Sequence, residues 1–234
     1  MGGEFSGMNR YRVGGAICFA FALLLAIGEG LILVMPGWYF DTATVMRDMI
    51  LVPVFGILGI ALWIAGTPFE KRAREFFLLM LPVFVLYVIV LFAALFGTSG
   101  FWRVSGGMRQ YNLKPFETIR LYLKAHQNGS LNWTIIAANL FGNILLFAPV
   151  GLALPYFIPL FRNKLCFLIG LLGGLCVIEY MQHLTGRGSM DIDDVILNSI
   201  GAIAVFLIVW NKRAQKRWIR IGILKKREGK EEPA

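Results

Sequence analysis

The chain has 234 residues, of which 57% are hydrophobic and 16% are charged, against about 25% charged residues in an average soluble domain. The apolar residues form long uninterrupted blocks and the charges collect between them, which excludes a soluble globular fold. We therefore predict an all-α polytopic membrane helix bundle. The net charge of +9 is assigned to membrane topology, with no nucleic acid partner, because no basic helix with interleaved aromatic residues lies away from the apolar segments.

The first residues look foreign to the fold. Residues 1 to 7 precede a second methionine, Met8, and Glu4-Phe5 is the dipeptide that a common cloning site encodes. We expect residues 1 to 7 to be a vector-derived leader. The apolar run after Arg12 can span a membrane and no small-residue cleavage site follows it, so we expect a retained span.

Six segments are long and apolar enough to cross a bilayer, which takes about 20 helical residues. They cover residues 13–35, 49–66, 76–97, 131–158, 165–184 and 194–210. Counted over alternate connecting segments, 16 Lys and Arg residues fall on the side of both termini and seven on the other. The positive-inside rule then predicts a multi-pass protein with both termini in the cytoplasm.

Two of the connecting segments carry a further pattern. In the outer loop, residues 98–130, apolar and charged residues take opposite helical faces from Pro115 to His126, which predicts a short amphipathic helix in the outer interface. A loop helix packed on the spans is the alternative. The tail, residues 211–234, mixes bases with Trp218, and we expect it to anchor the chain to anionic lipid.

Polar side chains concentrate in the last three predicted spans, where an ionised group costs on the order of 3 kcal/mol and needs a partner or a task. Helical spacing places them in stripes that the orientation brings together near the outer leaflet. They are Asn139, Asn143, Glu179, Gln182, His183, Asp194 and Asn198, and the connection between the last two spans adds Arg187, Asp191 and Asp193.

Several of these residues have structural alternatives. Asn139 and Asn143 can serve as hydrogen-bonding contacts between helices. Asp191 and Asp193 can cap the sixth span, and His183 can be a packing residue. Glu29 in the first span has no evident partner, and the three cysteines lie inside apolar blocks, which favours a packing role.

The polar residues lie within strings that resemble one family. The strings are Asn112-Leu-Lys-Pro-Phe116, Asn139-Leu-Phe-Gly-Asn143-Ile-Leu-Leu-Phe-Ala-Pro149-Val-Gly151, Glu179-Tyr-Met-Gln182, Gly186-Arg187 and Asp191-Ile-Asp193-Asp194-Val-Ile-Leu-Asn198-Ser-Ile-Gly201. In order and spacing over residues 76–210 they resemble the VanZ family. The chain differs from the shorter family pattern by two additional N-terminal helices within residues 8–75, and residues 211–234 follow as a basic cytoplasmic tail.

The resemblance implies a bacterial plasma-membrane protein linked to resistance to teicoplanin, with little effect on vancomycin. It does not supply a mechanism. Teicoplanin carries an acyl chain and vancomycin does not, so we expect an outer-leaflet cleft with apolar walls and a polar rim to bind an amphiphile. The expected partners are membrane lipid, a lipid-linked cell-wall precursor or the lipoglycopeptide itself.

In this interpretation the polar residues contact the amphiphile and loop arginines hold its phosphate or carboxylate groups. The predicted ligand-binding residues are Asn139, Asn143, Glu179, Gln182, Arg187, Asp191, Asp194 and Asn198, with Arg103, Arg109 and Arg120 as phosphate contacts. No cofactor or metal is expected. These site residues do not decide whether the protein is an enzyme, and we favour a non-enzymatic role.

Two other functions stay open. A metal-dependent membrane enzyme acting on a lipid-linked phosphate or cell-wall precursor would hold a divalent metal through Glu179, His183, Asp191, Asp193 and Asp194. No HExxH or nucleophile elbow supports it. A lipid transporter or flippase is the third possibility, but the two halves of the chain show no clear internal similarity.

Overall fold

The structure is a computed structural model that describes residues 2–34, 42–96, 111–186 and 190–225. This part is mainly helical. Its helices are α1 (Gly2–Val34), α2 (Thr42–Ala65), α3 (Phe69–Phe96), α4 (Glu117–Gln127), α5 (Trp133–Phe157), α6 (Lys164–Leu184), α7 (Ile192–Val209) and α8 (Lys212–Arg220). The 3-10 turn η2 (Pro159–Arg162) joins α5 to α6, and β1 (Tyr111–Asn112) and β2 (Met190–Asp191) form a short parallel pair.

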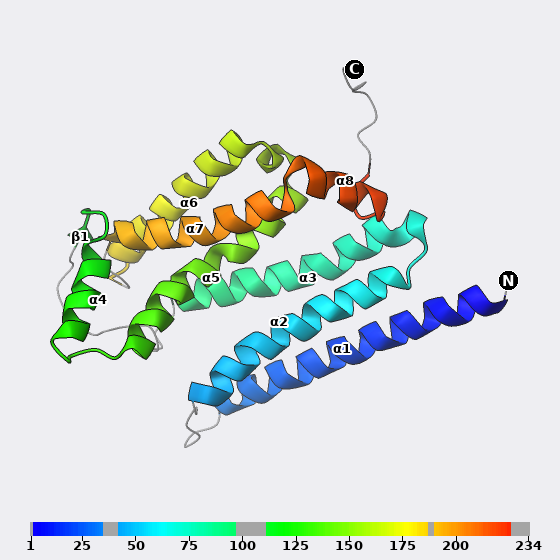
Figure 1. Cartoon of the computed structure of the whole chain (residues 1–234), viewed down its shortest axis with the longest axis horizontal. Coiled ribbons are helices and arrows are strands. Elements are labelled where there is room, and N and C mark those ends of the chain that lie inside the picture. Colours follow the sequence, from blue (N-terminus) through cyan, green and yellow to red (C-terminus); the bar gives the residue numbers. More distant parts are fainter. Residues whose placement is uncertain (1, 35–41, 97–110, 187–189, 226–234) are drawn as a thin grey trace. The chain divides into compact units, whose positions relative to one another are not determined.

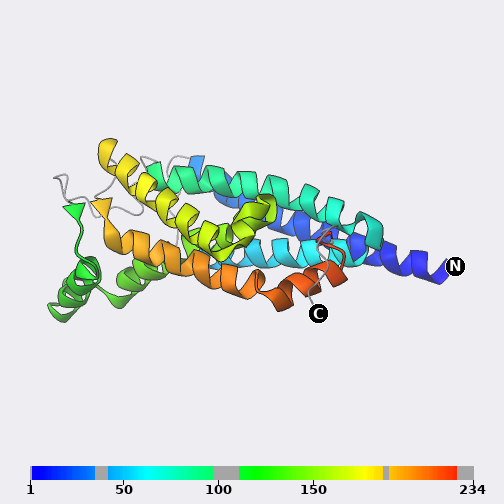
Figure 2. The same cartoon turned by 90° about the horizontal axis from the view of Figure 1, so that it is seen from above.

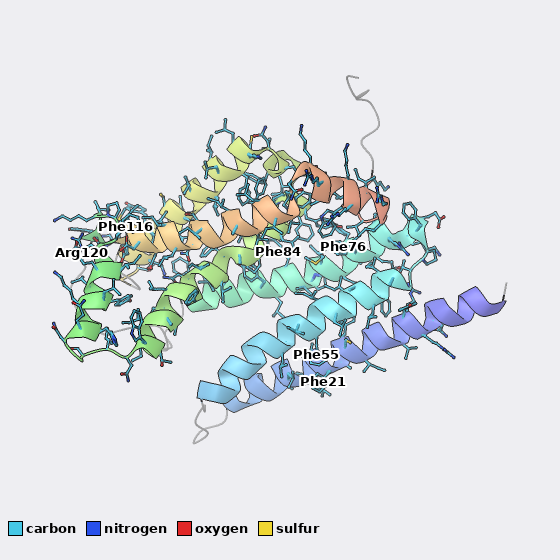
Figure 3. The ribbon with its side chains drawn as sticks, in the orientation of Figure 1. Phe21, Phe55, Phe76, Phe84, Phe116 and Arg120 are labelled. Carbon is cyan, nitrogen blue, oxygen red and sulfur yellow. The ribbon has the colours of Figure 1, made fainter. Side chains whose placement is uncertain are left out.

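The chain forms two compact units, residues 1–82 with 218–234, and residues 83–217. In the first unit α1 and α2 lie side by side (Figures 1 and 2). A Cβ atom on Gly15 would lie 2.9 Å from the carbonyl oxygen of Gly59, so glycine allows the two backbones to approach. The rings of Phe21 and Phe55 pack edge to face across the pair at 4.6 Å (Figure 3).

The second unit is built on a close α5–α7 pair, on which α6 also packs (Figure 1). A Cβ atom on Gly201 of α7 would lie 1.7 Å from the carbonyl oxygen of Ile144, and one on Gly151 of α5 would lie 2.1 Å from that of Ala202. Small residues at such crossings are typical of helix packing in membranes. The pair fixes the register between α5 and α7.

Three described helices are long and apolar enough to cross a membrane: α5, α6 and α7. They correspond to the predicted spans 131–158, 165–184 and 194–210. The predicted spans 13–35, 49–66 and 76–97 are largely helical, as α1, α2 and α3, but their crossing of the membrane stays a prediction, as does the cytoplasmic location of the termini. The side chain of Glu29 lies outside the described part.

Helix α4 is the short helix expected in the loop of residues 98–130, but its predicted start at Pro115 is wrong. The helix begins at Glu117, and Phe116 before it has a left-handed backbone with φ 65°. The reason is a tertiary contact, described below, that aligns the first amide groups of α4. The β1–β2 pair was not predicted, because two-residue strands leave no pattern in the sequence. The location of α4 at the outer interface stays a prediction.

Candidate functional site

Four acidic residues gather where α6 ends and α7 begins. They are Glu179, Asp191, Asp193 and Asp194, which we call the carboxylate network. Glu179 is 4% exposed, Asp191 6% and Asp193 0%. Burial of this many carboxylates is costly unless each one accepts hydrogen bonds, so the partners of each oxygen indicate what the network does.

Asp193 caps α4 from a distance in the sequence. Its carboxylate accepts hydrogen bonds from the backbone N–H groups of Phe116, of Thr118 at 2.8 Å and of Ile119 at 3.3 Å. The first N–H groups of a helix have no partner inside the helix and carry its positive dipole end. The Asp193 carboxylate satisfies both requirements, and the left-handed Phe116 turns the chain toward it.

Asp191 links four segments. It is the N-cap of α7, where its side chain accepts the N–H of Asp193 at 2.9 Å, so the predicted cap of this span is confirmed for Asp191 and not for Asp193. Its carboxylate also accepts from the Asn112 side chain of β1, at 3.1 Å, and from the Thr118 hydroxyl of α4. Its own N–H donates to Glu179 Oε2 at 3.1 Å.

Asp194 faces α5. It accepts a hydrogen bond from the side-chain amide of Asn143. Asp194 also influences Tyr122 of α4. Burial raises the pKa of the Tyr122 phenol, and the charges of Asp194 and Asp191 raise it further. Tyr122 therefore keeps its hydroxyl proton at neutral pH and is available as a hydrogen-bond donor.

Asn198 lies one turn beyond Asp194 on α7. It precedes Gly201 by three residues, so it belongs to the stripe that packs on α5. Its side chain is 3% exposed, and its Oδ1 atom is buried with no hydrogen-bond partner among the described residues. A buried acceptor left unpaired costs about 1–3 kcal/mol. Hydrogen bonding within the described part of the chain therefore does not explain why an asparagine occupies this position.

The remaining predicted site residues are more dispersed. Asn139 donates to Ile135 of its own helix, and Gln182 donates to the carbonyl of Leu95 in α3. Arg120 is exposed and forms an ion pair with Glu117 at 3.8 Å, so it does not join the network. The predicted contacts Arg103, Arg109 and Arg187 lie outside the described residues.

His183 lies one turn beyond Glu179 on α6. Its ring packs 5.3 Å from that of Tyr111, and its Nδ1 atom is buried without a described partner. No three His, Cys, Asp or Glu side chains within the described ranges are arranged to hold a metal ion. The carboxylate oxygens of Asp191 and Asp193 already accept N–H and O–H groups, so the geometry does not favour the predicted metal alternative.

The network is rich in carboxyl oxygen atoms. In the described part of the chain, none of its four carboxylates forms an ion pair with a Lys or Arg side chain. Carboxyl oxygens that are not occupied by the bonds described above can accept further hydrogen bonds, and the Tyr122 hydroxyl adds a donor. Such an arrangement suits a polar group that donates hydrogen bonds.

Sequence reasoning missed three participants, Asn112, Thr118 and Tyr122. Asn112 lay within a family-like string, which was the one signal that could have placed it at the site. Thr118 bonds to Asp191 and Tyr122 lies within the electrostatic influence of Asp191 and Asp194, and the helical periodicity of α4 does not show which element these side chains will meet.

Comparison with known families assigns the chain to one of them. A family profile described as VanZ/LLP1 matches residues 76–213, a range that contains the carboxylate network together with α4 to α7. No curated protein and no solved structure matches the chain. The matched range covers more than half of the chain, and the protein is a member of the VanZ/LLP1 family with the apolar helices of a membrane protein.

Proposed function

We propose that this protein resides in the bacterial plasma membrane as a multi-pass protein and lowers susceptibility to teicoplanin. It does so by binding an amphiphile, either the lipoglycopeptide or a lipid-linked envelope component, at the carboxylate network on the outer side. Family membership supports the membrane setting and the link to teicoplanin. The unpaired, buried Oδ1 of Asn198 beside the network is the observation that carries the site.

The chemistry of the site defines the polar part of the ligand. Asp194 and Asn198 offer oxygen acceptors, so the bound group donates hydrogen bonds, as an amide, hydroxyl or ammonium group does. Arg103, Arg109 and Arg187 are proposed to contact phosphate or carboxylate groups of the same ligand. Gln182 and Asn143 already pair with atoms of other helices, and we propose a positioning role for them in place of direct contact. Asn139 pairs only within its own helix, and we assign it no role in binding.

The apolar part of the ligand can pack against an exposed apolar surface of the protein. Large apolar side chains of the second unit point outward from α5 and α6, including Leu145 at 66% exposed and Ile169 at 63%. On membrane-spanning helices these faces meet acyl chains. An acyl chain lying along them would add affinity for teicoplanin that vancomycin, which has no such chain, cannot gain.

The test compares Asn198→Leu with wild type in a teicoplanin-susceptible bacterium at equal membrane abundance. Leucine keeps the branched shape of asparagine, with methyl groups in place of the amide oxygen and nitrogen, and removes the unpaired oxygen, so we expect the variant to accumulate normally. Protection against teicoplanin should fall to the level of cells that lack the protein. Susceptibility to vancomycin should be unchanged in all strains.

Asn139→Leu is the matched control, because its amide bonds only to its own helix, and it should retain protection. Full protection by Asn198→Leu would overturn the site. A wild-type protein that gives no protection against teicoplanin would overturn the function, whatever the variants do.

A further inference from the structure

Helix α8 carries all of its charge on one face. At 3.6 residues per turn its five bases fall within an arc of about 140°. They are Lys212, Arg213, Lys216, Arg217 and Arg220, all of them exposed. Ala214, Trp218 and Ile219 take the opposite side and are half-buried. The helix has no acidic residue that could neutralise this face.

The orientation of α8 is fixed at its start. The side chain of Asn211 accepts the N–H of Ala214 at 2.8 Å and donates to the carbonyl of Ile208 at 2.8 Å. The side chain of Gln215 donates to the carbonyl of Trp210 at 2.7 Å. These bonds close the bend between α7 and α8, so the basic face cannot rotate freely about the helix axis.

The apolar side is fixed as well. The indole ring of Trp218 packs edge to face on Phe76 of α3, with ring centroids 5.7 Å apart. Phe76 is 6% exposed (Figure 3 labels it). Because the apolar side is occupied by this contact, the basic face remains as the surface that α8 offers to a partner, with the exposed side chains of Arg213, Arg217 and Arg220 on it.

The same end of α7 carries further interfacial residues. The indole N–H of Trp210 donates to the carbonyl of Leu152 at 3.2 Å, and the guanidinium of Arg162 lies over the Trp210 ring at 5.2 Å from its centroid. Tryptophan and arginine at the end of a span are typical of the boundary between lipid and water. This composition favours a position for the start of α8 at the boundary between lipid and water.

We propose that α8 lies along the membrane surface and binds the phosphate groups of anionic phospholipids through its basic face. Arginine and lysine attract such headgroups through charge and hydrogen bonds. A one-sided basic helix fixed at the end of a span places Lys212, Arg213, Arg217 and Arg220 at one depth, where a row of headgroups can meet them. The partner is a lipid of the leaflet that surrounds the protein.

The test uses the full-length protein in detergent, with phosphatidylglycerol or phosphatidylcholine of identical acyl chains added as the probe. Lipid affinity is measured by native mass spectrometry. Wild type should prefer phosphatidylglycerol, and added salt should weaken the preference. The triple variant Arg213→Gln, Arg217→Gln, Arg220→Gln should lose roughly a hundredfold of it, because each base near an anionic surface contributes about one kcal/mol.

A triple variant in and just before α4, Lys114→Gln, Arg120→Gln, Lys124→Gln, changes the net charge equally and should keep the preference for phosphatidylglycerol. The three substituted side chains are exposed in each variant. Both variants should therefore fold, and a thermal unfolding curve checks this. An α8 variant that keeps the full preference would overturn the proposal. An equal loss in the α4 variant would also overturn it, because overall charge and not α8 would then determine lipid binding.

Discussion

Asp193 shows what a fully buried carboxylate does at this site. It accepts three backbone N–H groups at the start of α4, so removing the side chain leaves these donors without partners in a buried setting. We expect Asp193→Ala to lower the free energy of unfolding by about 1–3 kcal/mol or more. Asp193→Asn keeps one oxygen acceptor and should cost less.

The measurement is unfolding in detergent, followed by circular dichroism for both variants. Glu117→Gln is a suitable control, since it changes a charge in α4 without removing an acceptor from the network. Stability unchanged in Asp193→Ala would contradict the capping role.

At the residue scale, much of the site could be predicted from spacing alone. Polar residues four apart in a helix, such as Asp194 and Asn198 of α7, share a face, and helix packing brings Asp194 into contact with Asn143 of α5. The contacts of Asp193 could not be predicted in this way, because they join residues 116–119 to residue 193 through a left-handed turn. A tertiary hydrogen bond of that kind leaves no periodic signal.

Among the elements, the α5–α7 pair positions the network. Its crossing depends on glycine, because a Cβ atom on Gly201 would overlap the carbonyl oxygen of Ile144. Gly201→Ala should separate the helices, move Asp194 away from Asn143, and destabilise the protein by about 1–3 kcal/mol. Thermal unfolding in detergent measures the effect.

Gly173 of α6 supplies the control, since a Cβ atom there would meet nothing within 4 Å. Gly173→Ala should be neutral or slightly stabilising, because alanine favours helix. Equal stability of the Gly201→Ala and Gly173→Ala variants would show that the close approach of α5 and α7 does not limit stability.

The elements also show where periodicity was sufficient. Long apolar runs predicted α5, α6 and α7 within a few residues, because a bilayer-length helix leaves a strong signal. The start of α4 was misplaced by two residues, because Pro115 satisfies a local preference for the first turn while the carboxylate of Asp193 determines where the amides align.

For the molecule as a whole, charge is separated along α7. The carboxylate network occupies its N-terminal end and the bases of α8 follow its C-terminal end, which also agrees with the helix dipole. The 18 residues of α7 extend about 27 Å, close to the hydrocarbon thickness of a bilayer. The two charged ends therefore suit opposite membrane surfaces.

The central claim is that the network faces the outside, and cysteine labelling tests it most directly. Cys18, Cys166 and Cys176 are first replaced by alanine. Single cysteines are placed at Gln127, the last residue of α4, the helix that the network caps at its start, and at Lys164, the first residue of α6. In intact cells a membrane-impermeant maleimide should label Gln127→Cys, and should label Lys164→Cys only after permeabilisation. The reverse pattern would place the network in the cytoplasm and contradict the account.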